Sequence, residues 1–241
     1  MHILGIDTAT RIASVGIVCD GEIVAERAHL STANHTETLL PLILHLLEDS
    51  HCTLQEVQGL GVSIGPGSFT GLRVALGTAK GFAYALGQQV VGVSTLEALA
   101  RTVNDWEGAI CTVLDARKAE VYVAFFRRDC HGQIHRQSAD QVVAPHEFFS
   151  TLEEPCLFLG DGVERYEALL HEQCGPLAKL LPFSQYHPRG GTVALLAWER
   201  LSQGGSSVIG TLTPTYVRKP EAEFRRMSGA SLPCPDLRTS P

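Results

Sequence analysis

The sequence predicts an α/β fold made of two similar lobes, each a mixed sheet flanked by helices. Two observations carry this prediction. The stretch ILGIDTATRIASVGIVCDGEIVAERA (residues 3–28) reads as three short strands separated by polar turns, and ICTVLDARKAEVYVAFFRRDCHGQIHRQ (residues 110–137) repeats that order. In both halves the three strands are followed by helix, strand and helix, which indicates a duplicated unit.

The first half opens with an apolar strand that ends at Asp7, and Asp20-Gly21 marks the turn between the next two strands. The further elements expected here are strands at 13–19, 22–28, 59–64 and 90–93 and helices at 35–50, 68–86 and 95–104. We assign residues 1–105 to this N-terminal lobe.

The second half opens with a strand that ends at Asp115, and His131-Gly132 marks a hairpin turn before a third strand. The further elements expected here are strands at 120–127 and 156–160 and helices at 145–152, 162–172 and 192–203. We assign residues 106–218 to this C-terminal lobe. Residues 219–241, rich in proline, serine and charge, are expected to form a flexible tail.

Composition limits the function classes. The 241 residues are 44% hydrophobic and 19% charged, which is typical of a globular protein. Nineteen Lys and Arg against 26 Asp and Glu give a net charge of −7, so the chain has no basic field for nucleic acid and would meet RNA through a second protein. The seven cysteines form no CxxC pair, and neither a signal peptide nor a membrane-spanning apolar run is present, so we expect a reduced cytoplasmic protein.

The stretch SIGPGSFTGLRVALGTAKG (residues 63–81) resembles a phosphate loop at first sight. It lacks the G-x-x-x-x-G-K-[ST] pattern, and the third glycine of a G-x-G-x-x-G pattern comes one residue late, at Gly71. What remains is a strand, a tight turn made by Gly65 and Gly67, and a helix capped by Ser68. The glycines therefore need another explanation.

Two of these glycines lie inside the predicted helix, where Gly77 and Gly81 each cost about 1 kcal/mol relative to alanine. They share one side of the helix with Thr70, Val74 and Tyr84, and small residues in a row let another backbone approach closely. That backbone belongs either to the chain's own sheet or to another protein.

The preceding helix, TLLPLILHLLED (residues 38–49), favours another protein. Its apolar residues cover an arc of roughly 200° at 100° per residue, whereas a helix that lies on one sheet needs an arc only a little over about 100°. The two helices together predict a protein interface. Besides the residues named above, the expected interface residues are Leu40, Ile43, Leu44, Leu47 and Arg73.

The sequence offers no convincing catalytic set. His131 and His135 have a metal-pair spacing for a helix, but they flank a hairpin, where they would stand about 13 Å apart. No G-x-S-x-G nucleophile motif is present, and Gly160-Asp161-Gly162 reads either as a turn or as a close approach to an adenosine. We therefore expect no catalytic residue, no metal and no cofactor.

The duplicated strand order resembles the ribonuclease H-like lobes of the actin, sugar kinase and chaperone ATPase superfamily. The resemblance implies that Asp7 and Asp115 face nucleotide phosphates across the cleft between the lobes, with Thr8 and Arg117 beside them. The alternative is that each aspartate only caps its turn. An ATP-dependent kinase or hydrolase that uses both aspartates is thus the second candidate function.

A narrower resemblance rests on ILGIDTAT, HTETLLPLI, IGPGSFTGLRVALGTAKGFAYAL and LDARKAEVY, with PTYVRKPEAE echoing the family's ending. These stretches resemble the TsaB (YeaZ) family, required to make threonylcarbamoyladenosine in tRNA. The resemblance implies a noncatalytic paralogue of TsaD, the subunit that transfers threonylcarbamoyl. In GVSTLEAL (residues 92–99), Thr95 and Leu99 stand where TsaD has its metal-binding histidines.

The same resemblance implies the partners. The chain would bind TsaD as a heterodimer through the helices at 35–50 and 68–86, which are the two helices that the apolar arc and the glycines single out. The ATPase TsaE would join the complex, tRNA would be met only through the complex, and the chain alone would form a homodimer. Ala9 stands where sugar kinases have a phosphate-loop glycine, which counts against nucleotide binding by this chain alone.

Overall fold

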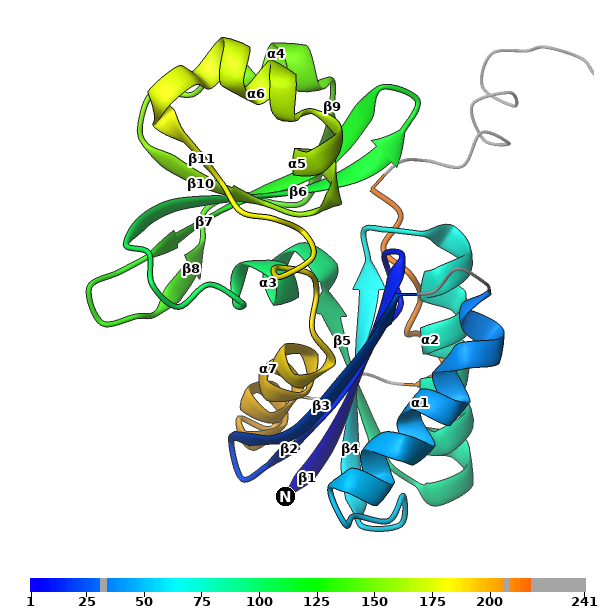
Figure 1. The fold of residues 1–241 in the computed structure, drawn as a ribbon. Helices are drawn as coiled ribbons and strands as arrows, with labels where there is room; N and C mark the ends of the chain where they lie inside the picture. The colour runs from blue at the N-terminus through cyan, green and yellow to red at the C-terminus, as the bar shows by residue number, and fades with distance from the viewer. Residues whose placement is uncertain (31–33, 206–208, 218–241) are drawn as a thin grey trace, which may run out of the picture.

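The computed structural model describes residues 1–30, 34–205 and 209–217, and the chain forms two lobes, each built on one sheet (Figure 1). The first sheet contains β1 (His2–Asp7), β2 (Ile12–Cys19), β3 (Glu22–Leu30), β4 (Val57–Gly65) and β5 (Gln89–Ser94). The second contains β6 (Gly108–Arg117), β7 (Glu120–Arg128), β8 (Ile134–Arg136), β9 (Gln141–Val143), β10 (Cys156–Leu159) and β11 (Ala178–Leu180). The helices are α1 (His35–Asp49), α2 (Phe69–Leu86), α3 (Thr95–Ala100), α4 (Pro145–Phe149), α5 (Asp161–Arg165), α6 (Glu167–Cys174) and α7 (Gly190–Ser202).

The two sheets have the same strand arrangement. The first has the order β3-β2-β1-β4-β5, and the second has the order β8-β7-β6-β10-β11, with β9 also paired to β7. In each sheet the first three strands of the lobe pair antiparallel. On the other side of the first strand, β4 and β5 in one sheet and β10 and β11 in the other pair in parallel. The predicted duplication and the α/β class are confirmed.

Several predicted boundaries differ from the structure. The helices expected at 95–104 and 145–152 end earlier, at Ala100 and Phe149. The helix expected at 162–172 is two helices, because Tyr166 leaves helical geometry (φ −115°, ψ 21°) between α5 and α6. The short strands β9 and β11 were not expected, since three residues are too few to show a periodicity.

Helix α7 follows the second sheet in the chain but packs on the first sheet, where it contacts β1, β2 and β4. Its first turn crosses a row of three adjacent glycines, Gly16, Gly5 and Gly61, that are paired across these strands. A Cβ added at Gly5 would lie 2.0 Å from the Gly190 carbonyl oxygen. The missing side chains therefore let the helix backbone rest on the sheet backbone.

Residues 209–217 also return to the first lobe. Leu212 is buried in the core between the first sheet and helices α1 and α2, and the Thr215 amide donates to the Ile64 carbonyl at 2.7 Å. The expectation that residues 106–218 form one C-terminal lobe is therefore wrong for α7 and for this segment. The tail expected at 219–241 lies outside the described residues.

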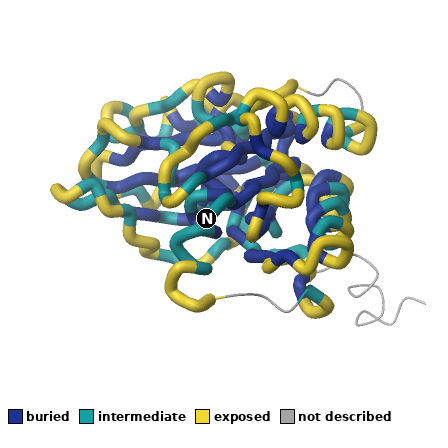
Figure 2. Tube along the Cα trace, turned by 90° about the horizontal axis from the view of Figure 1, so that it is seen from below, coloured by how far each residue is buried: buried dark blue, intermediate teal, exposed yellow. Residues whose placement is uncertain are grey.

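Each lobe has its own buried core. Helices α1 and α2 cover one face of the first sheet and α7 covers the other (Figure 1). Helices α4 and α6 lie together over the second sheet, where Phe149 and Phe158 pack edge to face. Figure 2 shows the buried segments gathered in the interior and the exposed ones around the periphery.

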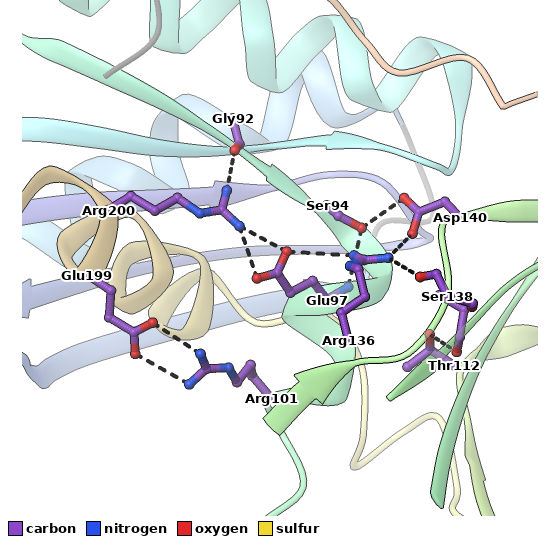
Figure 3. A network of polar contacts seen from close by, with 11 residues as sticks. Gly92, Ser94, Glu97, Arg101, Thr112, Arg136, Ser138, Asp140, Glu199 and Arg200 are labelled. Atoms are coloured by element: carbon purple, nitrogen blue, oxygen red, sulfur yellow. Dashed lines mark hydrogen bonds and ion pairs between the residues drawn. The ribbon is translucent and has the colours of Figure 1, made fainter. Parts of the chain in front are cut away.

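Polar contacts around α3 join the two lobes (Figure 3). The Glu97 carboxylate accepts hydrogen bonds from Arg200 of α7 and lies 3.6 Å from the Arg136 guanidinium of β8. Arg136 pairs with Asp140 at 2.6 Å, and the Ser94 hydroxyl donates to the same carboxylate at 3.0 Å. This network ties the two lobes together at the junction around α3, which we call the hinge.

Candidate functional site

Helix α2 presents an open face. Ser68 caps it, and its hydroxyl accepts a hydrogen bond from the Gly71 amide at 3.2 Å. The inward side is buried against the sheet and comprises Gly71, Leu72, Ala75, Leu76, Ala79 and Ala83. The opposite side is exposed and carries Phe69, Thr70, Arg73, Gly77, Gly81 and Tyr84. Five of the residues predicted for an interface therefore share one exposed face, while Val74 lies half-buried at its edge.

The glycines of this face have open space above them in the part of the chain that the structure describes. A Cβ added at Gly77 or Gly81 would meet no atom within 4 Å. The interpretation that these glycines pack against the chain's own sheet is therefore wrong. Their cost in helix propensity has no compensation within the described chain.

Helix α1 contributes two leucines to the exposed surface. Leu40 and Leu44 are 49% and 59% exposed. Ile43 and Leu47, which the sequence also placed in the interface, are instead buried in the core. The apolar arc of α1 is wider than the sheet can cover, and its edge at Leu40 and Leu44 turns away from the sheet.

Two further aromatic residues extend the face at the start of α2. The rings of Phe69 and Tyr216 stack with centroids 5.4 Å apart, and the Arg73 guanidinium lies 3.8 Å from the Phe69 centroid. The sequence pattern alone predicts no role for Phe69 or Tyr216. The exposed Phe69 at a helix start gave a weak signal, whereas nothing in the sequence indicates that Tyr216 comes back to α2.

The turn before α2 holds the loop between β1 and β2. The Ser68 amide donates to the Ala9 carbonyl at 2.7 Å, and the Thr8 hydroxyl donates to the Gly71 carbonyl at 2.7 Å. A Cβ at Gly71 would lie 1.9 Å from the Thr8 carbonyl oxygen. The glycines at 67 and 71 thus make room for this loop. The Thr8 hydroxyl is already engaged in its hydrogen bond to α2.

Asp7 lies beneath the same loop and is fully buried. One carboxyl oxygen accepts from the Ala9 amide at 3.1 Å, and the other has no hydrogen-bond partner in the described chain. Burial raises the pKa of Asp7 to about 7. Asp7 and Thr8, predicted for a nucleotide cleft, are therefore enclosed and do not line its cavity.

A cavity of about 780 Å³ lies between the lobes. Its walls come from the β1–β2 loop, the α2 start and the β6–β7 hairpin, and they include Asp115 and Arg117. Arg165 and Arg117 pair with the Asp115 carboxylate at 2.8 and 3.2 Å. Two of the four predicted cleft residues, Asp115 and Arg117, thus lie at the cavity. The Asp115 carboxylate is already paired with two guanidinium groups.

The second lobe contributes more carboxylates to this cavity. Asp161 accepts from the Asp115 amide at 3.0 Å, and burial raises the pKa of Asp161. Glu164 reaches across the cavity to Arg11 of the β1–β2 loop, with 2.6 Å between guanidinium nitrogen and carboxylate oxygen. Three arginines, Arg11, Arg117 and Arg165, line the same cavity, and each is paired with Glu164 or Asp115, so carboxylates and guanidinium groups balance in number there. The stretch Gly160-Asp161-Gly162 forms the junction between β10 and α5, and Asp161, the first residue of α5, lies in the cavity wall.

Comparison with known proteins identifies the family. A family model described as TsaD: tRNA N6-adenosine threonylcarbamoyltransferase matches residues 22–226. TsaB of Escherichia coli, named a tRNA threonylcarbamoyladenosine biosynthesis protein, is 31% identical over 237 residues, covering 95% of this chain and 99% of that protein. The chain belongs to the TsaB family. TsaB of Bacillus subtilis is 29% identical over 228 residues, covering 93% of this chain and 97% of that protein.

Solved structures agree with the TsaB family assignment. YeaZ from Pseudomonas aeruginosa superposes with a TM-score of 0.76 at 25% identity, covering 89% of this chain and 99% of that chain. Component A of the (R)-2-hydroxyglutaryl-CoA dehydratase of Acidaminococcus fermentans superposes with a TM-score of 0.52 at 13% identity, covering 84% and 99% of the two chains. The second likeness shows the fold alone.

In this TsaB-family chain the stretch at residues 92–99 is part of the hinge. Thr95 and Leu99 are fully buried, and Leu99 packs in the core between α3 and the second sheet. Among the described residues, no group of three or more His, Cys, Asp or Glu side chains is placed to hold a metal ion. The helices of that part of the chain are also too short or too polar to cross a membrane.

Proposed function

We propose that the chain is a noncatalytic subunit in the synthesis of threonylcarbamoyladenosine in tRNA, and that it acts by binding TsaD through the exposed face of α1 and α2. The pathway is that of its TsaB relatives, which are named for it. The observation that carries the binding role is the open space over Gly77 and Gly81.

That open space has a physical meaning. Two glycines within a helix lower its stability by about 2 kcal/mol in total relative to alanine. The flat strip they leave allows a partner helix to approach closely. Leu40, Leu44 and Tyr84 stand exposed around it and supply apolar area to bury.

Three observations support a noncatalytic role. Asp7 and Thr8 are buried away from the cavity between the lobes. Asp115 is paired with two arginines. Thr95 and Leu99 carry no imidazole for a metal and lie in the core. The chain's contribution would then be the surface it offers to the catalytic subunit.

The proposal includes further partners. TsaE joins the complex of this chain with TsaD, and tRNA is met only through that complex, in line with the net charge of −7. The place of action is the cytoplasm. In the absence of TsaD, the same face pairs with a second copy, because an exposed apolar strip can serve a symmetric dimer.

Leucine substitutions at the glycines test the binding role. Gly77→Leu and Gly81→Leu each fill the strip with a side chain, and we expect each to lose co-purification with TsaD and tRNA modification in the presence of TsaE and ATP. Ala139→Leu, which adds a leucine at an exposed position of the second lobe, is the matched control. Wild-type affinity of both glycine variants for TsaD would refute the proposed interface. Modification that proceeds equally well without this chain would refute the role itself.

The second candidate is an ATP-dependent kinase or hydrolase. The cavity between the lobes, with Asp115 and Arg117 in its wall, is the observation in its favour. The enclosed position of Asp7 speaks against it. ATP turnover by the purified chain alone, lost in Asp7→Asn, would support this candidate over the scaffold.

A further inference from the structure

The start of α2 holds an arginine in an unusual position. The Arg73 guanidinium lies over the Phe69 ring, and its Nε donates to the Tyr216 hydroxyl at 3.4 Å. Phe69 and Tyr216 are themselves 52% and 39% exposed. The two rings fix the plane of the guanidinium on the open face. Because the side chain is already ordered, less conformational entropy is lost when a partner binds it.

Within the part of the chain that the structure describes, this guanidinium has no carboxylate partner. Every other described arginine lies within ion-pair distance of an Asp or Glu, except Arg128, whose guanidinium donates to the Val103 carbonyl. Arg73 donates only to a hydroxyl, at a long distance. The other N–H groups of this exposed guanidinium have no hydrogen-bond acceptor among the described residues and are available to a partner.

The charge of α2 points in the same direction. The helix carries Arg73 and Lys80 and no acidic residue, although the whole chain has a net charge of −7. Lys80 comes seven positions after Arg73, which places the two cations on one side of the helix about 10 Å apart along its axis. Gly77 lies between them on the exposed side. The open face thus carries Arg73 at its aromatic end, with the half-buried Lys80 at its edge and no acidic residue on the helix.

We propose that Arg73 is the charge-recognition residue of this face and forms a two-pronged ion pair with an aspartate or glutamate carboxylate of the docking protein. The inference rests on the proposed function and names the chemistry of its partner. A planar guanidinium matches a carboxylate with two parallel hydrogen bonds. Aromatic residues and arginine are also the residue types that dominate binding energy at protein interfaces.

A protein carboxylate fits better than a nucleic-acid phosphate. Nucleic-acid binding draws on many cations at once, and α2 offers only two. Around Arg73 the face is apolar and flat, with Phe69, Tyr216 and Gly77 as neighbours. Such surroundings exclude water around one ion pair, which strengthens that pair.

Affinity measurements with TsaD test the inference. We expect Arg73→Met to raise the Kd by about tenfold or more, because the partner's carboxylate is left unpaired in the interface. Arg73→Lys keeps the charge but loses the planar fork, so its Kd should lie between those of the wild type and Arg73→Met. Arg127→Met, which removes an exposed arginine of the second lobe, is the matched control and should bind as the wild type does.

A zero-length carbodiimide cross-linker identifies the partner group. In Arg73→Lys the new amine should couple to an Asp or Glu of TsaD, and mass spectrometry of the cross-linked peptides locates both ends. Coupling to the chain's own Glu221 or Glu223 would overturn the inference, as would a Kd of Arg73→Met equal to that of the wild type. An effect of Arg73→Met on tRNA binding by the assembled complex, with TsaD affinity unchanged, would assign the residue to a phosphate instead.

The two proposals fail in different ways. If the wild-type chain does not bind TsaD, the proposed function is refuted before Arg73 is tested. If Gly77→Leu loses binding while Arg73→Met and Arg73→Lys keep it, the interface stands and the role of Arg73 is wrong.

Discussion

Arg200 donates hydrogen bonds to both carboxylate oxygens of Glu97, at 3.0 and 2.9 Å, and so joins α7 of the first lobe to the hinge helix α3 (Figure 3). Glu97 also faces Arg136 of the second lobe. Its carboxylate is therefore shared by guanidinium groups from both lobes, and its side chain is only 23% exposed. A carboxylate in that position contributes to holding the two lobes together.

Removing it should be costly. We expect Glu97→Ala to lower the free energy of unfolding by about 1–3 kcal/mol, less than the loss for a fully buried pair because Arg136 and Arg200 stay partly solvated. Asp49→Ala, which removes the exposed partner of Arg27, should cost at most about 1 kcal/mol. Urea unfolding of both variants measures the difference. Equal losses would show that the hinge network adds nothing beyond a surface ion pair.

Alanine at two glycines should have opposite effects. Gly5→Ala puts a Cβ 2.0 Å from the Gly190 carbonyl oxygen, so α7 must move, and we expect a loss of at least about 2 kcal/mol. Gly77→Ala adds a Cβ in open space within a helix, so it should stabilise the free chain by up to about 1 kcal/mol. Thermal unfolding of the two variants measures both signs. A stable Gly5→Ala chain would contradict the backbone contact described for α7.

Local pattern predicted much of this fold. Alternating and continuous apolar runs located the main strands, and the helices at 35–50 and 68–86 match α1 and α2 to within one residue at each end. The glycines at 77 and 81 were informative because a helix interior gives glycine a known cost, so their presence pointed to an exposed or closely packed face.

What the sequence missed depends on contacts between distant segments. The arc of α1 showed that too many positions were apolar, but which of Ile43 and Leu44 turns inward depends on how the helix is rotated on the sheet. The position of α7 on the first sheet follows from a row of glycines in three strands, which only the sheet register brings together. The stacking of Tyr216 on Phe69 likewise has no local signal.

Neighbouring residues of α1 should separate folding from binding. Ile43 is buried in the core, so Ile43→Ala should cost about 2–5 kcal/mol of stability. Leu44 is 59% exposed, so Leu44→Ser should change stability by no more than about 0.5 kcal/mol and yet weaken TsaD binding. Unfolding curves and affinity measurements on both variants test this. A Leu44→Ser chain that binds TsaD normally would remove α1 from the proposed interface.

Asp7 should make stability depend on pH. The carboxyl of the unfolded chain ionises near the ordinary aspartate pKa of 3.8, whereas burial keeps the folded carboxyl protonated up to about pH 7. Between these values the folded state binds more protons than the unfolded state, so raising the pH lowers the free energy of unfolding, by about 1.4 kcal/mol per unit of pKa difference. Above pH 7 the carboxyl is ionised in both states, and its contribution no longer changes.

Asp7→Asn isolates this effect, because the amide mimics the protonated carboxyl and can still accept from the Ala9 amide. Relative to the wild type, the variant should gain stability steadily from pH 4 to pH 7 and hold that gain above pH 7. Subtracting the two unfolding profiles removes the contributions of other titrating groups. A difference that shrinks with rising pH would mean that Asp7 is ionised and held by a cation in the folded state, and it would restore Asp7 as a candidate for the nucleotide chemistry of the cleft.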